Sequence, residues 1–306
     1  MYNILGTDIS HWQGQPSFDK MKEHGIQFLY AKAGEYLKGN LYPEWEDDEY
    51  ARNRAEAKRV GIPFGAYYYF HPAVGASDQA RHFLNIVNKY DKPELPLVID
   101  IEVDDNRSPA QVANVLYSFI TYLEQRGWQD RIIIYTRNGF WVNQVGHPSW
   151  GENYPFWIAQ YPRTDIIKEP YKYTTKPSGL SEGVHRLIWQ FTERMQLPGL
   201  PNMDGNWWTG TEIEWDEFIK PVGDTTPEYP PQFVPIDVEI TANFLRYRTS
   251  PIFYSPPTMI VEKGEILKAI DKVYSSGIWW YKVELPEKYG TGTAYISAEN
   301  GYTRRV

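Results

Sequence analysis

The strongest constraint on the fold is an alternation between short apolar runs and helix-like segments through the first 220 residues. Such runs predict buried strands, and strands that alternate with helices are typical of βα units. We predict strands at residues 4–9, 27–33, 63–70, 96–102, 131–135, 155–160 and 186–191. We predict helices at residues 18–24, 46–60, 77–89 and 109–126. This order favours an α/β fold, a TIM-like (β/α)-barrel of regular or irregular form. A doubly wound sheet is disfavoured because no glycine-rich phosphate turn follows the first strand.

The predicted helices have recognisable ends. Ser108 and Pro109 form a good helix start, with serine as the cap and proline in the first turn. Ser77 is a candidate cap for the preceding helix. Glycine follows three of the predicted helices, at Gly25, Gly61 and Gly127, where a left-handed cap residue is expected.

The character of the chain changes after residue 220. Residues 221–235 contain five prolines, which is typical of a stiff linker. Short alternating segments with turn signals follow, at residues 242–247, 258–261, 266–274, 279–284 and 293–297. They predict a small all-β domain. We therefore expect a large domain at residues 1–220, a linker at 221–235 and a β domain at 236–306.

Composition excludes several kinds of function. The chain has no cysteine, so disulfides, thiolate metal sites and a cysteine nucleophile are excluded. A net charge of −8 argues against nucleic acid as a partner. No stretch approaches the roughly 20 apolar residues of a membrane-spanning helix, so we expect no membrane insertion. The six histidines lack metalloprotease spacing, and we expect no metal and no cofactor.

Two carboxylates end one of the buried strands. The apolar run at residues 95–99 continues into Asp100 and Glu102. Strand side chains alternate between faces, so both acids point the same way, with Cα atoms roughly 6.5–7 Å apart. Most enzymes that cleave glycosidic bonds use a pair of carboxyl groups as catalytic residues. The alternative is a pair of solvated acids that begin a loop, because Asp104 and Asp105 follow closely.

Other polar and aromatic residues follow the remaining strands. In a β/α barrel, the catalytic side chains come from the C-terminal ends of the strands. The residues at or just after these ends are Asp8, Trp12, Glu35, Tyr67, Tyr69, Tyr135, Tyr161, Gln190 and Asp204. Acids, amides and aromatics suit a polyhydroxylated substrate, and the aromatic content of 16% suits stacking on sugar rings. Each aromatic residue could instead belong to the core.

The ordered set of these motifs resembles glycoside hydrolase family 25, the Chalaropsis-type lysozymes or N-acetylmuramidases. The matching stretches are residues 6–12, 32–35, 65–68, 100–102 and 189–190, followed by Asp204. The resemblance covers roughly residues 3–220 and implies that Asp8, Asp100, Glu102 and Asp204 are the essential acids. One departure is that Gly34 and Tyr36 stand where the family usually has Thr and Gly.

The C-terminal part resembles a bacterial SH3-like domain. The matching stretches are residues 245–251, 261–264, 277–283 and 294–296. The resemblance implies that this domain binds the cell wall. The alternative is a lid that packs on the barrel.

These observations predict a peptidoglycan hydrolase that cleaves the β-1,4 bond between N-acetylmuramic acid and N-acetylglucosamine. We predict that Glu102 is the general acid and that repulsion from Asp100 raises the pKa of Glu102. From the spacing alone, retaining and inverting mechanisms both stay open. The resemblance implies retention, with the substrate's acetamido group as nucleophile and Asp100 orienting it. Asp8 and Asp204 then either position the substrate or adjust the pKa values of Asp100 and Glu102.

Two other functions stay open at this stage. The first is hydrolysis of chitin or another N-acetylhexosamine polymer, and the second is a non-catalytic glycan-binding protein. We expect bacterial peptidoglycan as the partner and a monomer as the active form. The first residues contain neither a basic region nor a long apolar core, so we expect no signal peptide. This suits either a phage endolysin released through membrane lesions or a secreted enzyme without its signal.

Overall fold

The computed structural model describes residues 4–37, 43–90, 92–163, 165–176, 178–220, 235–249, 251, 257–275, 278–298 and 302–306. The chain divides into two compact units. The first consists of Met1–Gly151 with Pro155–Val222, and the second of Glu152–Tyr154 with Gly223–Val306. The predicted linker at residues 221–235 lies outside the described residues, except for Pro235.

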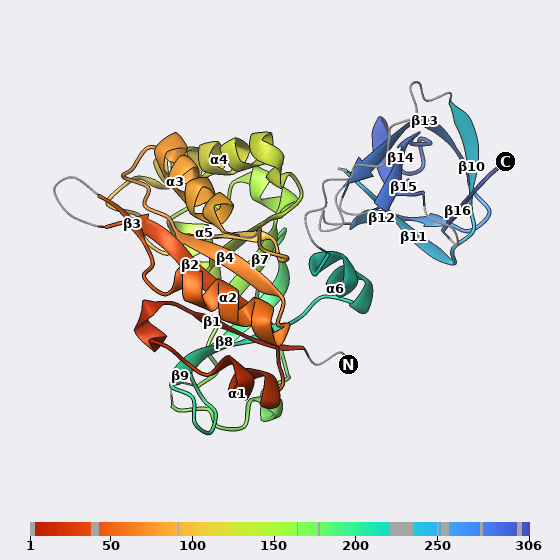
Figure 1. Cartoon of the computed structure of the whole chain (residues 1–306). Helices are drawn as coiled ribbons and strands as arrows, with labels where there is room; N and C mark the ends of the chain where they lie inside the picture. The colour runs from red at the N-terminus through yellow and green to blue at the C-terminus, as the bar shows by residue number, and fades with distance from the viewer. Residues whose placement is uncertain are drawn as a thin grey trace. The chain divides into compact units, whose positions relative to one another are not determined.

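Eight strands of the first unit close into a barrel (Figure 1). They are β1 (Leu5–Ile9), β2 (Ile26–Tyr36), β4 (Phe64–Tyr69), β5 (Leu97–Asp100), β6 (Ile132–Thr136), β7 (Pro155–Ala159), β8 (His185–Gln196) and β9 (Asn202–Trp208). Their order is β1-β9-β8-β7-β6-β5-β4-β2, and pairing of β1 with β2 completes the ring. Strand β3 (Glu44–Glu46) extends β2 on its outer side. All seven predicted strands are present, with shifted ends.

The barrel differs from a regular TIM barrel at β9. This strand runs antiparallel to both of its neighbours, β8 and β1, whereas the other barrel pairings are parallel. The expectation of a TIM-like barrel is corrected to a mixed α/β barrel. We did not predict β9 as a strand, and its Asp204-Gly205-Asn206 segment is typical of a turn. Pairing on both edges outweighs this weak local preference.

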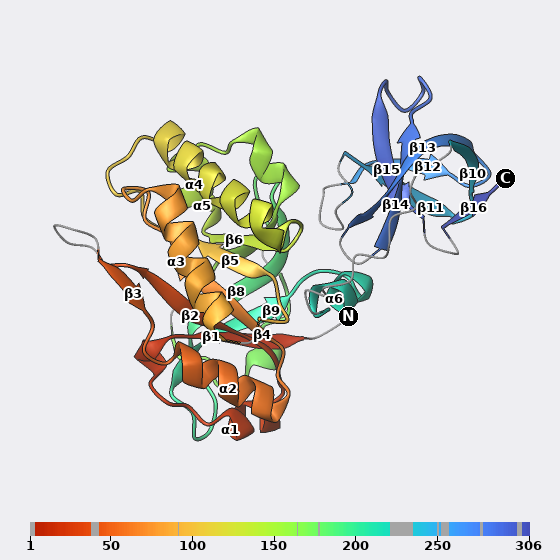
Figure 2. The same ribbon diagram turned by 45° about the horizontal axis from the view of Figure 1, so that its top comes forward.

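Helices cover the outside of the barrel (Figure 2). They are α1 (Phe18–Glu23), α2 (Tyr50–Val60), α3 (Ala76–Lys89), α4 (Pro109–Leu123) and α5 (Asn138–Asn143). Helix α6 (Glu212–Phe218) packs differently, with the Trp215 ring 5.7 Å from the ring of Phe28 in β2. The predicted start at Ser108 is confirmed, with a capping box to Gln111. The predicted cap Ser77 is wrong, since Gly75 precedes α3. All three predicted cap glycines have positive φ. None of the described helices is long and apolar enough to span a membrane.

Close packing of aromatic rings fills the barrel interior below its C-terminal rim. The rings of Tyr30 and Trp157 lie 5.1 Å apart, and Tyr135 contacts Trp157 edge-on at 5.0 Å. A Cβ atom at Gly65 would lie 2.0 Å from the Tyr30 ring, so only glycine leaves room for it. This packed layer forms a rigid floor beneath the polar residues of the rim.

Among its described residues from Pro235 onward, the second unit contains seven strands and no helix, and five of these strands match predicted segments. Its seven strands are β10 (Ile236–Ile240), β11 (Phe244–Arg248), β12 (Pro257–Glu262), β13 (Ile266–Ser275), β14 (Ile278–Glu284), β15 (Thr293–Ser297) and β16 (Thr303–Arg305). They form one antiparallel sheet in the order β12-β11-β15-β14-β13-β10-β16. Its core includes Val238, Val261, Val283 and Ile296. The likeness of this unit to an SH3-like domain stays a prediction.

Candidate active site

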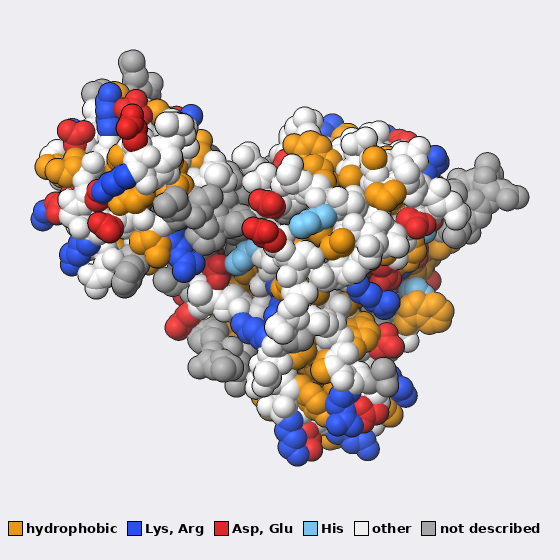
Figure 3. Space-filling view, turned by 180° about the vertical axis from the view of Figure 1, so that it is seen from behind, with side chains coloured by type: hydrophobic (Ala, Val, Ile, Leu, Met, Phe, Trp, Pro, Cys, Tyr) orange, Lys and Arg blue, Asp and Glu red, His pale blue; other side chains and the backbone are white. Residues whose placement is uncertain are grey.

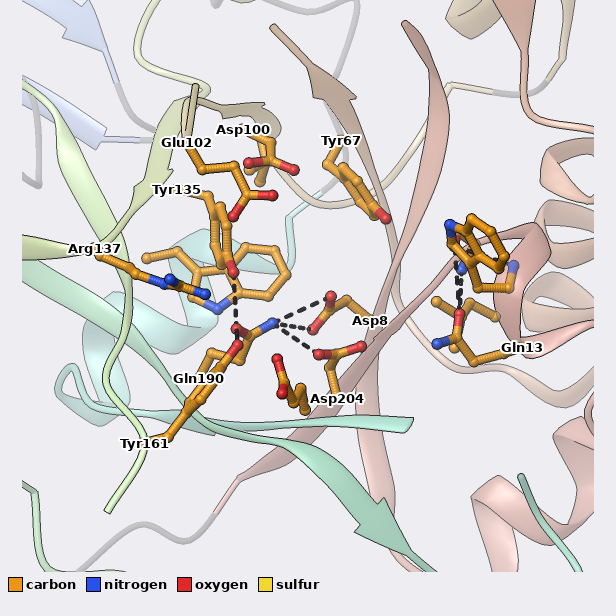
Figure 4. Close-up of a pocket in the computed structure, with 16 residues that line it drawn as sticks. Asp8, Gln13, Tyr67, Asp100, Glu102, Tyr135, Arg137, Tyr161, Gln190 and Asp204 are labelled. Carbon is orange, nitrogen blue, oxygen red and sulfur yellow. Dashed lines mark hydrogen bonds between the residues drawn. The ribbon is translucent and has the colours of Figure 1, made fainter. Parts of the chain in front are cut away.

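A pocket of about 230 Å³ opens at the rim where the parallel strands end (Figure 4). Its lining residues come from several strands that are far apart in the sequence. They are Asp8, Ile9, Ser10, Trp12, Gln13, Tyr67, Val98, Asp100, Glu102, Tyr135, Arg137, Trp157, Tyr161, Gln190, Glu193 and Asp204. Five of them carry a carboxylate and one, Arg137, carries a positive charge. By contrast, acidic and basic side chains are interspersed on the molecular face seen in Figure 3.

The structure brings together most of the residues predicted from the sequence. All four predicted catalytic acids line the pocket, as do Trp12, Tyr67, Tyr135, Tyr161 and Gln190. Two predicted binding residues, Tyr69 and Glu35, are not among the lining residues. Our sequence reasoning missed Gln13, Arg137 and Glu193. Arg137 lies two residues beyond Tyr135, and the unexpected length of β8 brings Glu193 to the rim.

The register of the strands explains why the acids converge. Asp8 on β1 is directly opposite Asp204 on β9. Because β9 runs in the opposite direction, its beginning lies at the rim where the parallel strands end. Like charges directly opposite one another destabilise a sheet, so the pairing of Asp8 with Asp204 points to a functional requirement.

Asp100 and Glu102 are placed differently from our expectation. Strand β5 ends at Asp100, which pairs with Tyr69 on one side and Tyr135 on the other. Glu102 lies two residues beyond the strand end, although Ile101 still donates a backbone hydrogen bond to Tyr135 O at 3.0 Å. Both carboxylates nevertheless reach the same pocket.

The amide of Gln190 connects both sides of the pocket (Figure 4). Its Oε1 accepts hydrogen bonds from the hydroxyls of Tyr135 at 2.8 Å and Tyr161 at 2.7 Å. Its Nε2 donates to Asp8 Oδ1 at 3.0 Å and lies 3.4 Å from Asp204 Oδ1. Two phenol donors on one end and two carboxylate acceptors on the other determine the orientation of this amide. Gln190 therefore holds Asp8 and Asp204 in position.

A second amide supports Asp8 from below. Asn206 donates to Asp8 Oδ1 at 2.7 Å. Its own Oδ1 accepts a hydrogen bond from Trp157 Nε1 at 2.9 Å, which fixes the direction of the amide. Asp8 is thus a buried carboxylate with two amide donors.

Burial dominates the electrostatics of the acids. Burial raises the pKa of Asp8 to about 6, although hydrogen bonds from Asn206 and Gln190 oppose the shift. Burial also raises the pKa of Asp204 well above its ordinary value, and the charge of Asp8 adds to this effect. Such shifts towards the neutral form are a common property of catalytic carboxyl groups.

The pKa of Glu102 is raised chiefly by burial, while the positive charges of Arg137 and Lys32 oppose the shift. Our expectation that repulsion from Asp100 is the main cause is therefore corrected. Repulsion acts on the partner instead: burial raises the pKa of Asp100 well above its ordinary value, and Glu102 raises it further. The two carboxyls form a coupled pair that holds protons more tightly than free acids do.

One oxygen of Asp100 has no hydrogen-bond partner among the described residues. Its Oδ1 is buried, and the side chain is one of those that line the pocket. A buried acceptor without a partner is costly, so it requires an explanation. An unpartnered buried oxygen disfavours the charged carboxylate, in agreement with the raised pKa of Asp100.

Charged side chains pair beside the pocket, next to Asp100 and Glu102. Lys32 Nζ lies 2.7 Å from Glu35 Oε1 and 4.8 Å from the centre of the Tyr69 ring. His71 lies between Glu35, at 3.4 Å, and Asp105, at 3.1 Å. The predicted binding residue Glu35 is therefore part of an ion-pair cluster. Within the described ranges, no three His, Cys, Asp or Glu residues form a group suited to a metal ion.

We expect Asp8→Asn to alter the pH dependence of stability. Asp8 in the folded protein has a pKa of about 6 instead of its ordinary 3.8, so the folded state holds this proton more tightly. Its contribution to stability is present below pH 4 and is lost as the pH rises through 6. Wild type should therefore lose about 3 kcal/mol of unfolding free energy relative to Asp8→Asn across this window. Urea denaturation at pH 4 to 7 measures the difference.

The matched control for this measurement is Asp48→Asn, which changes an exposed carboxylate outside the pocket. Its stability should follow wild type at each pH. Parallel curves for wild type and Asp8→Asn would contradict the raised pKa of Asp8.

Comparison with known proteins gives a consistent result. The family model "Glycosyl hydrolases family 25" matches residues 7–200. The chain is 28% identical over 228 residues to the uncharacterized protein YegX of Escherichia coli (strain CFT073), covering 73% of this chain and 76% of YegX. It is 29% identical over 221 residues to lysozyme M1 of Streptomyces globisporus, covering 68% of each chain.

A solved structure shows the same similarity. The family 25 glycosyl hydrolase from Bacillus anthracis matches with a TM-score of 0.57 at 25% sequence identity. The match covers 71% of this chain and 94% of the Bacillus chain.

Proposed function

The chain belongs to glycosyl hydrolase family 25 and is therefore a glycoside hydrolase of the lysozyme type. On this basis, we propose that it cleaves one particular bond of bacterial peptidoglycan. This is the β-1,4 bond between N-acetylmuramic acid and the following N-acetylglucosamine. The proposal rests mainly on one observation. Two carboxyls with raised pKa values, the buried Asp100 and the half-buried Glu102, meet at the rim of a barrel in a pocket rich in acids and aromatics.

Glu102 supplies the proton in this mechanism. The raised pKa favours the protonated form of the carboxyl, which donates its proton to the glycosidic oxygen as the bond to C1 breaks. In the second step, the Glu102 carboxylate takes a proton from water, which then attacks C1. The same group therefore acts first as acid and then as base.

Asp100 assists the nucleophile. The substrate's acetamido oxygen attacks C1 from the face opposite the leaving group, giving a cyclic oxazolinium that water then opens with net retention. In the reactive form of the coupled pair, the proton is on Glu102 and Asp100 is ionised. The Asp100 carboxylate, which lines the pocket, accepts a hydrogen bond from the acetamido N–H and stabilises the positive charge that develops there. Asp8 and Asp204, held by Gln190, position the sugar that carries this group.

Aromatic side chains bind the sugar chain. The Trp12 side chain lines the pocket and is 81% exposed, which leaves its face available to a pyranose ring. Tyr67, Tyr135 and Tyr161 complete the walls around the acids. Tyr69 and Glu35 act from beside the pocket, through the Lys32 cluster.

Product analysis tests this proposal. Purified peptidoglycan is digested while turbidity is followed, and the soluble fragments are analysed by mass spectrometry. Fragments that end in reducing N-acetylmuramic acid are expected, with the β-anomer formed first in proton NMR spectra. Reducing N-acetylglucosamine ends would assign the cut to the other bond. The α-anomer would indicate inversion. An absence of products would favour chitin as substrate, or a binding function.

We also propose that residues 236–306 bind the bacterial cell wall, where the enzyme acts either as a phage endolysin or as a secreted enzyme. The resemblance to SH3-like domains and the antiparallel sheet support this role. A chain of residues 1–222 should lose at least about tenfold in rate on intact walls because a tethered second site raises the effective substrate concentration. It should keep its rate on short soluble fragments. Equal losses on both substrates would show that the second unit supports the fold of the first.

A further inference from the structure

The pocket contains a single cationic side chain among its lining residues. The carboxylates of Asp8, Asp100, Glu102, Glu193 and Asp204 face the same space as the guanidinium of Arg137. We propose that Arg137 forms an anion subsite, which binds a carboxylate on the O3 substituent of N-acetylmuramic acid. This inference rests on the proposed function and specifies which part of the substrate is recognised.

Arg137 is held in place by an immobilised ring. Its guanidinium carbon lies 6.0 Å from the centre of the Tyr161 ring. The hydroxyl of Tyr161 donates to Gln190 Oε1 at 2.7 Å, so the ring cannot turn freely. Gln190 itself is buried. The guanidinium therefore rests on a rigid support, which reduces the entropy lost when it binds a ligand.

The guanidinium keeps donors for a ligand. Within the described part of the chain, its closest interactions are with Tyr161, and no carboxylate forms an ion pair with it. Glu102 acts on it only through its charge at longer range. An arginine has five N–H donors in a planar fork that fits a carboxylate in two parallel hydrogen bonds.

Arg137 makes the two ends of the pocket chemically different. Figure 4 shows Arg137 and Tyr161 on one side of the acids and Gln13 on the other. The exposed Trp12 neighbours Gln13 in the sequence. One end of the pocket thus suits the apolar face of an uncharged sugar, whereas the other end suits an anion.

The chemistry of the substrate supplies such an anion. N-acetylmuramic acid differs from N-acetylglucosamine by a lactyl ether at O3. The lactyl group ends in a carboxylate in peptide-free strands, or in a peptide stem that has carboxylates of its own. Five acidic side chains repel such a group, and the guanidinium of Arg137 offsets that repulsion. An uncharged N-acetylglucosamine polymer has no group for this subsite.

The test compares charged and neutral substrates with matched variants. Hydrolysis of peptide-free glycan strands is measured before and after their carboxylates are converted to methyl esters, and hydrolysis of peptide-bearing strands is measured alongside. The proteins are wild type, Arg137→Gln, Arg137→Lys and the control Arg126→Gln, in which an exposed arginine outside the pocket is changed. Melting temperatures establish that each variant is folded.

We expect wild type to prefer charged over esterified peptide-free strands by about tenfold to a hundredfold in kcat/KM, the usual effect of a hydrogen-bonded charge. Arg137→Gln should lose this preference, so that charged and esterified strands are cleaved with similar kcat/KM. Arg137→Lys should lie between the two. A loss seen only on peptide-bearing strands would identify a stem carboxylate as the ligand instead of the lactyl group.

Two results would overturn the inference. One is an equal effect of Arg137→Gln on all three substrates together with a shifted pH profile, which means that Arg137 acts only through the titration of Glu102. The other is a wild-type enzyme that does not distinguish charged from esterified peptide-free strands, together with an Arg137→Gln variant that loses no rate on peptide-bearing strands. In both cases peptidoglycan is still cleaved, so the proposed function stands. If wild type releases no fragments from any strand, the proposed function fails first.

Discussion

Glu102→Gln should lower kcat/KM on peptidoglycan by more than about a hundredfold, the usual contribution of a positioned general acid. Glutamine has nearly the same shape and still accepts hydrogen bonds, but it cannot donate a proton to the glycosidic oxygen. The fold should be retained, because Glu102 lies beyond the end of β5 and makes no ion pair among the described residues. Turbidity clearance and release of reducing ends measure the rate.

The matched control is Glu193→Gln. It makes the same substitution in the same pocket, at a side chain that is exposed and has no proposed role in proton transfer. Its rate should fall less than about tenfold. Near-normal turnover by Glu102→Gln would mean that another carboxyl is the acid, and Asp100 would then be tested next.

Asp100→Asn should have the second large effect, a fall of about a hundredfold in kcat with a smaller change in KM. Asparagine keeps an acceptor oxygen for the acetamido N–H but loses the negative charge that stabilises the developing oxazolinium. The interaction therefore weakens more in the transition state than in the ground state, which lowers kcat. Initial rates over a range of glycan-strand concentrations separate the two constants.

Stability provides an independent readout for the same variant. The pKa of Asp100 is raised in the folded state, so its folded form holds the proton more tightly. The contribution of this proton to the free energy of unfolding is present at low pH. It is lost as the pH rises through the pKa that Asp100 has in the folded protein. Asp100→Asn should therefore melt at a higher temperature than wild type at neutral pH, with a difference that shrinks towards pH 4. A variant with full activity would contradict the role of Asp100 in orienting the acetamido group.

The parallel strands could be predicted because their signal is local. A run such as Val98-Ile99-Asp100 combines branched apolar residues with a polar end, and neighbouring residues alone determine that pattern. The same reasoning failed for β9. Its sequence contains turn-forming residues, and only its hydrogen bonds to β1 and β8 make it a strand.

Most residues of the candidate site, like most strands of the barrel, could be predicted from the sequence. Residues that follow the strands meet at one rim in any β/α barrel, which is why Asp8, Asp100 and Gln190 could be named in advance. Arg137 and Glu193 were missed, since neither belongs to a recognisable motif. Glu193 reaches the rim only because β8 continues to Gln196.

The amino-acid sequence by itself determined the order of the parallel strands and of helices α1 to α4, and it placed Asp8, Asp100 and Glu102 at strand ends, because apolar periodicity and strand ends are set by residues close together in the chain. Only the tertiary structure decided how those acids are held and charged. Gln190 and Asn206 reach Asp8 from 182 and 198 residues away. Burial, which chiefly raises the pKa of Glu102, arises from packing among distant segments. Such contacts and desolvation exist only after the barrel has closed.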